Sequence, residues 1–324
     1  MIDVCLISPP SRAFNHYRPP MALMYISSAL ENKGVSTGII DLKPNDPVFG
    51  LNKEEKQSII QTIVDKVVKL QPRYVGIPCC TPEYNEIISL AQKIKERLSN
   101  TIVIVGGTHP TLRPQDFFFE NTPIDYAVVG EGEITTFELI DALDHNKNLK
   151  QLQGLSFTDK KSGQLIRTET RPYIQDLDSL PFPDFKKLDM GYYTTPNPYC
   201  IRGIMLSSFY ILTGRGCPSS CTFCVSKNLR KIGEGKYLRF RSAKNVVDEI
   251  EYLVQNYKID GFYVMDDAFT LDKRHTIAIC DEIIKRKLNL VWGCESRINH
   301  VNEELLRKMR KAGCLQVDFG VESG

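Results

Sequence analysis

Long apolar segments are missing from this sequence: no run approaches the roughly 18 residues that a membrane-spanning helix needs. No basic segment precedes the apolar start at residues 1–5, as it would in a secretory signal peptide. Neither sign of charge is in excess, because 41 Lys and Arg against 39 Asp and Glu give a formal charge of +2. Such a balance offers no broad surface for neutralising nucleic-acid phosphates. We therefore expect a cytoplasmic protein that binds neither membranes nor nucleic acid.

Solenoid repeats and low-complexity tracts are absent as well, which excludes repeat architectures. Hydrophobic residues make up 42% of the chain and charged residues 25%, which are ordinary values for a globular protein and exclude wholesale disorder. At about 150 residues per domain, a length of 324 residues indicates two domains.

Short β-like runs alternate with amphipathic helical segments over the first 145 residues. Predicted strands lie at residues 2–7, 35–40, 73–77, 102–105 and 125–129, and predicted helices at residues 21–32, 53–70, 83–98 and about 135–143. This alternation predicts an α/β fold, with a Rossmann-like, doubly wound parallel sheet at residues 1–145. Ligands of such sheets bind outside the carboxyl ends of the strands.

Residues 146–200 interrupt this rhythm. Two β-like runs at 155–158 and 164–168 predict a hairpin, and the Pro-rich, aromatic segment after them predicts an ordered linker. The alternation resumes in residues 201–324, with predicted strands at 208–213, 261–265, 290–294 and 316–319 and helices between them. The second domain is therefore expected to contain about four β/α units.

Nine of the ten cysteines fall into two kinds. Six lie in or beside apolar runs and are interpreted as buried thiols: Cys5, Cys79, Cys80, Cys280, Cys294 and Cys314. Three others form a C-x3-C-x2-C pattern directly after a predicted strand: Cys217, Cys221 and Cys224. Thiolates are ligands for iron–sulfur clusters and for zinc, and three of them can hold three corners of a four-iron cluster while leaving one iron open. A structural zinc site needs a fourth ligand, and the sequence contains no second C-x2-C and no H-x3-H.

This pattern, with Phe223 just before its last cysteine, resembles the radical S-adenosylmethionine (SAM) enzymes. In that family three cysteines hold a 4Fe-4S cluster, whose open iron binds the amino and carboxylate groups of SAM. Reductive cleavage of SAM then gives a 5′-deoxyadenosyl radical, which abstracts hydrogen. The resemblance implies that Cys217, Cys221 and Cys224 are the metal ligands and that Phe223 lies against the adenine.

Three later stretches resemble the next strands of the family's β/α barrel: GFYVMDD at residues 261–267, WGCESR at 292–297 and FGVESG at 319–324. Polar residues at the carboxyl ends of barrel strands point into the mouth of the barrel. The resemblance therefore implies a set of cofactor-binding residues there: Asp266, Asp267, Glu295, Arg297 and Glu322.

Arg297 can pair with the SAM carboxylate, and Glu322 or Glu295 can accept hydrogen bonds from its ammonium group or ribose. The alternative for each residue is a strand-end charge that bonds a neighbouring loop. Because the family's barrel has about six β/α units, the resemblance also implies a partial barrel, with residues 316–319 as an open edge.

The N-terminal domain resembles the cobalamin-binding-like domain that precedes the barrel in one radical SAM subgroup. The stretches that carry this likeness are PPMAL at residues 19–23, VGGTHP at 105–110, DYAVVGEGE at 125–133 and LPFP at 180–183. Gly106 and Gly107 remove side chains at a strand end, so that a bulky group can approach the backbone. The cobalamin contacts implied are Cys80, Thr81, Gly106, Gly107 and Glu131.

One feature of many cobalamin-binding domains, an Asp-x-His-x-x-Gly motif after the first strand, is missing. The only histidine in residues 9–20 is His16, which follows Phe14 by two residues and precedes Pro19 by three. The resemblance therefore implies cobalamin held without a histidine ligand.

Together these likenesses imply an enzyme that uses a 4Fe-4S cluster, SAM and cobalamin to activate a C–H bond of a small-molecule substrate, with radical methyl transfer or cyclisation as the outcome. A reductase, flavodoxin or ferredoxin would supply the electron. The alternatives are a radical SAM enzyme with a cobalamin-free, vestigial N-terminal domain, a non-catalytic cluster- or cobalamin-binding sensor, and a zinc-binding structural protein.

Two further features receive a structural interpretation. The triplet Arg239-Phe240-Arg241 is interpreted as a solvated loop before a helix that Ser242 caps. His275 is interpreted as a surface or capping residue rather than a base.

Overall fold

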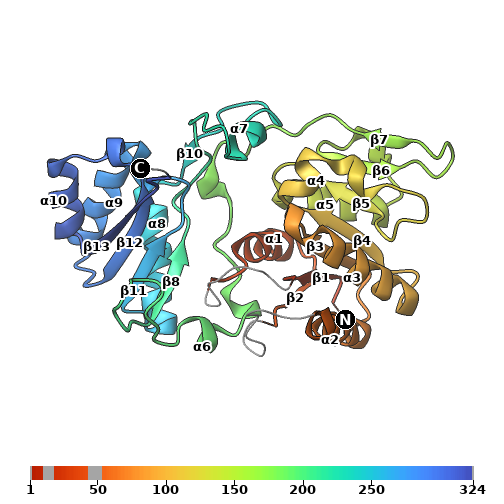
Figure 1. Ribbon diagram of the computed structural model, residues 1–324, viewed down its shortest axis with the longest axis horizontal. Helices are drawn as coiled ribbons and strands as arrows, with labels where there is room; N and C mark the ends of the chain where they lie inside the picture. The colour runs from red at the N-terminus through yellow and green to blue at the C-terminus, as the bar shows by residue number, and fades with distance from the viewer. Residues whose placement is uncertain (1, 10–17, 43–52, 323–324) are drawn as a thin grey trace.

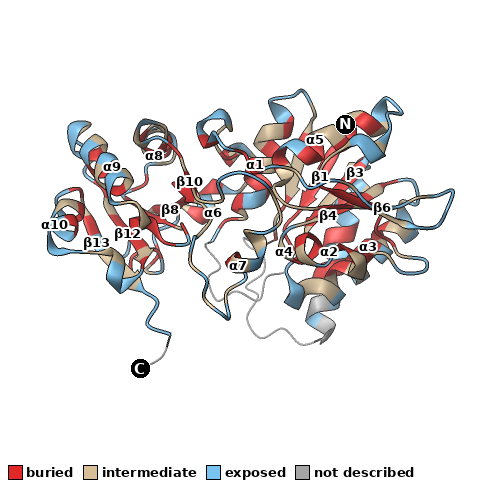
Figure 2. Cartoon of the chain, turned by 90° about the horizontal axis from the view of Figure 1, so that it is seen from above, coloured by how far each residue is buried: buried red, intermediate tan, exposed pale blue. Residues whose placement is uncertain are grey.

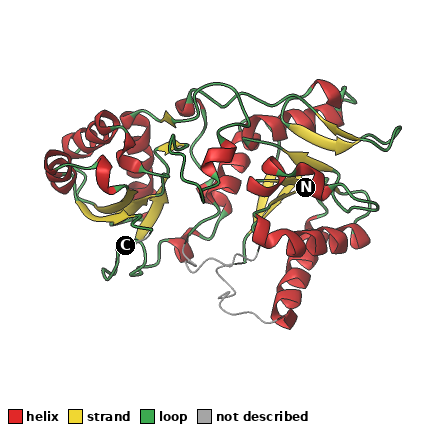
Figure 3. Ribbon diagram, turned by 45° about the horizontal axis from the view of Figure 1, so that its top comes forward, coloured by secondary structure: helices red, strands yellow, loops and turns green. Residues whose placement is uncertain are grey.

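Residues 2–9, 18–42 and 53–322 are described in a computed structural model, which places two β-sheets towards opposite ends of its longest axis (Figure 1). None of the helices in these ranges is long and apolar enough to cross a membrane. The segment between the sheets, residues 168–207, consists of loops, two 3-10 turns and the short helix α6 (Met190–Tyr193) (Figure 3). Buried aromatic side chains such as Phe185 anchor this segment, so the prediction of an ordered linker is confirmed.

Five parallel strands form the centre of the first sheet, in the order β2-β1-β3-β4-β5. They are β1 (Val4–Ile7), β2 (Thr37–Ile40), β3 (Tyr74–Pro78), β4 (Ile102–Gly106) and β5 (Tyr126–Val128). The helices are α1 (Met21–Glu31), α2 (Lys53–Leu70), α3 (Tyr84–Arg97), the short α4 (Thr108–Leu112) and α5 (Gly132–Asp144). Alternate residues of β1 separate two cores: Cys5 and Ile7 pack with α2 and α3, while Val4 and Leu6 pack with α1 and α5. The predicted doubly wound sheet is confirmed.

The predicted hairpin belongs to this sheet rather than to the linker. Strands β6 (Leu155–Thr158) and β7 (Leu165–Arg167) extend it antiparallel, with β6 paired to β5. The hairpin satisfies the backbone groups that the edge of β5 would otherwise expose. The first domain therefore extends beyond the boundary predicted at residue 145.

Four parallel strands form the second sheet, in the order β13-β12-β11-β8. They are β8 (Ser208–Ile211), β11 (Gly261–Val264), β12 (Val291–Ser296) and β13 (Cys314–Phe319). Helices α8 (Ala243–Tyr257), α9 (Lys273–Lys285) and α10 (Glu303–Lys311) share a core with one face of this sheet. Within the described ranges β13 pairs only with β12. The four predicted β/α units are confirmed, and they form an open, partial barrel.

Helix α1 joins the two domains. Its Met21, Met24 and Tyr25 belong to the core of the second sheet, whereas Leu23 and Leu30 pack against the first sheet. Figure 2 shows buried residues in both sheets and along this helix. The shared helix therefore holds the carboxyl edge of the first sheet close to the first strand of the second sheet, β8.

Candidate functional site

A cavity of about 290 Å³ opens at the carboxyl edge of the first sheet. Its walls come from the ends of β3 and β4, the start of α5 and one side of α1, and they are mostly apolar. In sheets with the strand order 2-1-3-4-5, ligands bind at the switch point between the first and third strands, and this cavity lies there.

Glycines create the space in this cavity. A Cβ at Gly76 would lie 2.8 Å from Leu6 Cδ2, and a Cβ at Gly132 would lie 3.2 Å from Ile26 Cδ1. Gly107 has φ +95°, and a Cβ there would lie 3.2 Å from the backbone N and O of Cys79. Side chains at these positions would fill or distort the cavity, so the sequence keeps it open for a bulky apolar group.

Of the predicted cobalamin contacts, Gly106, Gly107 and Glu131 line the cavity. Cys80 and Thr81 are exposed and lie outside its wall. The interpretation of Cys80 as a buried thiol is therefore wrong, because the chain leaves the sheet after Pro78; it is confirmed for the other five cysteines. His16 lies outside the described residues.

Glu131 binds two arginines of the second domain. Its carboxylate accepts hydrogen bonds from Arg215 Nη1 at 3.0 Å, from Arg239 Nη1 at 2.8 Å and from the Ile174 N–H at 2.7 Å. Burial opposes ionisation of Glu131, but the hydrogen bond from Arg239 and the charge of Arg215 lower its pKa. Glu133, also in the cavity wall, accepts from Arg215 Nη2 at 2.6 Å.

The interpretation of residues 239–241 as a solvated loop is wrong. Arg239 lies in the short strand β10 (Arg239–Phe240), which pairs with β9 (Gly214–Arg215). Arg239 and Arg241 are buried and form ion pairs with Glu131 and Glu249. Both arginines are buried because buried carboxylates pair with them, Glu131 from the first domain and Glu249 from helix α8. The predicted cap is confirmed, because Ser242 Oγ accepts a hydrogen bond from Asn245 N–H at 3.1 Å.

The cysteine loop starts from a buried anchor at the end of β8. Asp266 Oδ1 accepts a hydrogen bond from Thr213 N–H at 2.7 Å, and Asp266 also accepts from the Thr213 hydroxyl. Burial raises the pKa of Asp266 to about 6, against these hydrogen bonds. Asp266 thus holds the base of the loop, and its implied contact with SAM stays a prediction.

His275 supports the same anchor and is not a surface or capping residue. Its Nε2 lies 3.2 Å from Thr213 Oγ1, and its ring stacks on Phe240 with centroids 4.5 Å apart. Burial lowers the pKa of His275 to about 4, so the ring is neutral at physiological pH.

Cys217, Cys221 and Cys224 are half-buried free thiols on one loop. In the part of the chain that is described, no three Cys, His, Asp or Glu side chains are gathered closely enough to hold a single metal ion. Three cysteine sulfurs on one loop are a donor set that fits a four-iron cluster, which takes each sulfur at a separate iron corner.

Two arginines shape this loop. Arg297 donates to Ser219 Oγ at 2.6 Å, and its Nη2 lies 3.4 Å from Cys221 Sγ. Arg230, just after helix α7 (Ser226–Leu229), donates to the Pro218 carbonyl. Arg297 thus lies beside one of the three sulfurs, and Arg230 holds the backbone of the loop at Pro218. Sequence reasoning missed Arg230, which no motif distinguished.

The other residues implied for SAM lie at or just after the carboxyl ends of β11, β12 and β13, except Phe223, which belongs to the cysteine loop. Phe223 is 71% exposed and Glu322 is exposed, as is Asp267. Glu295 is half-buried, and Arg18 of the first domain lies 3.8 Å from its Oε1. The structure brings Arg297 to the cysteine loop, and the SAM-binding roles stay predictions.

Two family models match the chain: the B12 binding domain over residues 12–140 and the Radical SAM superfamily over residues 211–324. This chain belongs to the radical SAM superfamily and carries a B12-binding domain. The two matched regions correspond to the sheet that bears the cavity and to the partial barrel that bears the cysteine loop.

Similar proteins include other radical SAM enzymes. An uncharacterized methyltransferase of Pyrococcus horikoshii is 32% identical, over 100% of this radical SAM chain and 66% of the relative. Anaerobic magnesium-protoporphyrin IX monomethyl ester cyclase of Rubrivivax gelatinosus is 29% identical, over 94% of this chain and 52% of the relative. The methyltransferase TsrM of Kitasatospora setae, solved with cobalamin and a 4Fe-4S cluster, superposes with a TM-score of 0.72 at 20% identity, covering 99% of this chain and 59% of that one. The chain thus spans about half to two thirds of their lengths, and the superposition establishes the shared fold.

Proposed function

We propose that this chain is the cofactor-binding part of a cobalamin-dependent radical SAM enzyme. One observation carries the proposal: Arg215, two residues before Cys217, forms ion pairs with Glu131 and Glu133 in the wall of the apolar cavity. A corrinoid site and a cluster site are therefore adjacent, as an enzyme needs if it uses both cofactors in one reaction.

The apolar cavity of the first domain would hold part of the corrinoid. Gly106 and Gly107 allow a close approach to the backbone, and Gly132 leaves room beside Ile26. The absence of the Asp-x-His-x-x-Gly motif from the sequence fits binding without a histidine ligand to cobalt.

The cysteine loop would hold the cluster through Cys217, Cys221 and Cys224. Asp266 fixes the loop at its base, while Arg297 is placed to balance thiolate charge or to bind the SAM carboxylate. When bound, the cluster, SAM and cobalamin supply radical and methyl-transfer chemistry, and the protein supplies orientation and exclusion of water.

The substrate is proposed to be a small molecule, with methyl transfer or cyclisation as the outcome. The methyltransferase and cyclase relatives support this range. A flavodoxin, ferredoxin or reductase is proposed to supply the electron, and the cytoplasm is the proposed location.

Anaerobic reconstitution of the full-length protein with iron, sulfide and hydroxocobalamin tests this function. We expect about four irons and four sulfides per chain, bound corrinoid, and 5′-deoxyadenosine after addition of SAM and dithionite. Protein without corrinoid that still cleaves SAM would support the cobalamin-free alternative. Cluster without SAM cleavage would support the sensor, and zinc without iron would support a structural protein.

Replacement of one loop cysteine sharpens this test. Cys224→Ala should lose the cluster and all SAM cleavage, because two sulfurs from the loop cannot retain a four-iron cluster. Cys280→Ala, in the core of the second domain, serves as the control and should keep both. Cleavage by Cys224→Ala at the wild-type rate would remove the ligand assignment.

A further inference from the structure

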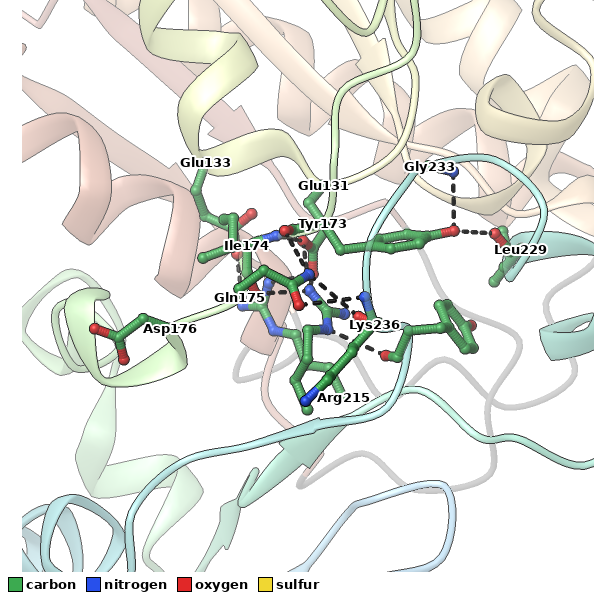
Figure 4. A network of polar contacts seen from close by, with 12 residues as sticks. Glu131, Glu133, Tyr173, Ile174, Gln175, Asp176, Arg215, Leu229, Gly233 and Lys236 are labelled. Atoms are coloured by element: carbon green, nitrogen blue, oxygen red, sulfur yellow. Dashed lines mark hydrogen bonds and ion pairs between the residues drawn. The ribbon is translucent and has the colours of Figure 1, made fainter.

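A chain of buried charges links the cavity to the strand that leads into the cysteine loop (Figure 4). Arg215 bridges Glu131 and Glu133, and Glu131 in turn bridges Arg215 and Arg239. The side chains are only 4–21% exposed, so solvent screens these pairs little. The two arginines and the two glutamates of this network balance each other in charge.

Other contacts complete the network on the second-domain side. Arg239 also donates to the carbonyl of Ile174 at 2.9 Å and to that of Tyr237 at 3.1 Å. The guanidinium of Arg215 lies over the Tyr25 ring, 5.4 Å from its centroid. Because these groups are bonded on several sides, the network holds a defined geometry rather than a loose attraction.

The Glu131–Arg215 pair also separates two cavities. A second cavity of about 250 Å³ lies on the side of the cysteine loop, lined by Gly216, Tyr237 and Leu229 among others. Both cavities include Glu131 and Arg215 in their walls. A ligand that displaces this pair from within one cavity therefore changes the wall of the other cavity.

The backbone passes such a displacement directly to the cysteines. Arg215 lies opposite Arg239 in the two-stranded β9–β10 ribbon, so both arginines move with it. Only Gly216 separates Arg215 from Cys217. Gly216 has φ +89°, and a Cβ at this position would lie 2.3 Å from Tyr237 O, so no other residue fits. The position of Arg215 thus sets where the loop begins.

We infer that Arg215 is a positioning residue that couples the filling of the cavity to the assembly of the cysteine loop through Glu131 and Glu133. The inference rests on the proposed function, since it takes the two ligands to be a corrinoid and an iron–sulfur cluster. A corrinoid in the cavity would hold the network from the side of the carboxylates, and a cluster would hold it from the side of Arg215. Each ligand then favours the same arrangement of the Glu131–Arg215 pair, so the coupling is positive, and it is reciprocal.

The test measures the dissociation constant of hydroxocobalamin by absorbance, for full-length protein with and without its reconstituted cluster. The coupling factor is the ratio of the two constants, and for the wild type we expect tighter binding with the cluster by about 5-fold or more. A variant that merely loses a corrinoid contact changes both constants alike, so the ratio isolates the coupling.

The main variant is the double substitution Arg215→Gln with Glu133→Gln. It removes one cation and one anion and retains the Glu131–Arg239 pair, so it leaves no uncompensated buried charge. Its coupling factor should fall towards one, and that of Glu131→Gln should fall as well. The control is Glu138→Gln on the same helix α5, which breaks an ion pair with Arg171 in the linker and should keep the wild-type factor.

Equal hydroxocobalamin affinity with and without the cluster in the wild type would overturn the inference while leaving the proposed function intact. A wild-type coupling factor in the double variant would also overturn it. No hydroxocobalamin binding in either state would instead contradict the proposed function, and the inference would fall with it.

Discussion

The cavity of the first domain and the cysteine loop of the second are held in different ways. Regular elements form most of the cavity wall, and buried side chains of two hydrophobic cores support them. The loop from residue 216 to residue 225 has no strand or helix of its own. Polar side chains such as Arg230 and Arg297 hold it, and Asp266 binds Thr213 just before it.

This difference separates a preformed site from one that its ligand completes. Packing keeps the cavity open whether or not it is filled, as in most small-molecule sites. Phe223 and Val225 are exposed, so apolar packing contributes little to the order of the loop, and a bound cluster would contribute more. Variants that remove supports of the loop should therefore lower stability and cluster content. Variants that only fill the apolar part of the cavity, away from Glu131 and Glu133, should lower corrinoid affinity and leave the cluster content unchanged.

The largest effect on stability is expected at the buried ion pair between Arg241 and Glu249, which lies next to the anchor of the loop. Arg241 Nη1 lies 2.5 Å from Glu249 Oε2 and donates to the carbonyl of Leu212, next to the Thr213 anchor. Arg241→Met would leave the fully buried Glu249 carboxylate without its cation. We expect the free energy of unfolding in urea to fall by about 3–5 kcal/mol, and Arg241→Met with Glu249→Leu to recover most of it.

The exposed pair Arg307–Glu303 on α10 is the matched control for this measurement. Arg307→Ala should change the unfolding free energy by no more than about 0.5 kcal/mol, because solvent screens a surface pair. An Arg241→Met protein as stable as the wild type would show that the pair does not support the fold.

A smaller effect, dependent on pH, is expected at the base of the loop. The pKa of Asp266 is raised from 3.8 to about 6 by burial, so the folded protein keeps its proton to higher pH than the unfolded chain. The contribution of Asp266 to the free energy of unfolding should therefore fall by about 3 kcal/mol as pH rises from about 4 to about 6, and stay level above that window.

Asp266→Asn checks this contribution, because an amide keeps a hydrogen-bonding side chain without a titrating group. The pH dependence of urea unfolding between pH 4 and 6 should be reduced by the contribution of Asp266 in this variant. A slope equal to that of the wild type would mean that Asp266 is ionised throughout that window, contrary to its burial.

The sequence predicted well what depends on local pattern. The alternation of strands and helices gave both sheets, and the C-x3-C-x2-C spacing singled out the loop that the Radical SAM model covers. The apolar cavity was anticipated only through Gly106, Gly107 and Glu131, because its other walls come from four separate segments.

Pairs between distant residues escaped prediction. Arg215 and Arg239 meet Glu131 across 84 and 108 residues, and no local window shows that these arginines are neutralised. Arg239 was therefore interpreted as a solvated charge, and so was Arg241, although its partner Glu249 lies on the helix that follows it. The available signal was weak: Gly-Glu-Gly-Glu at residues 130–133 and two arginines on short strands are complementary in charge, but nothing in the sequence brings them together.

The smallest effect is expected for a substitution that changes only the volume of the cavity. Gly132→Val places methyl groups beside Ile26, where even a Cβ would lie 3.2 Å from Cδ1, so the side chain fills the cavity. We expect hydroxocobalamin to bind at least about 10-fold more weakly, or about 1.4 kcal/mol, with iron and sulfide content unchanged. Gly132→Ala should weaken it less, and Ile134→Val, at a 39% exposed position on the same helix, should leave it unchanged. Packing holds the cavity and polar contacts hold the loop, so a folded Gly132→Val protein that lost its cluster would contradict this difference between the two sites. Unchanged corrinoid affinity would mean that the corrinoid does not enter the cavity.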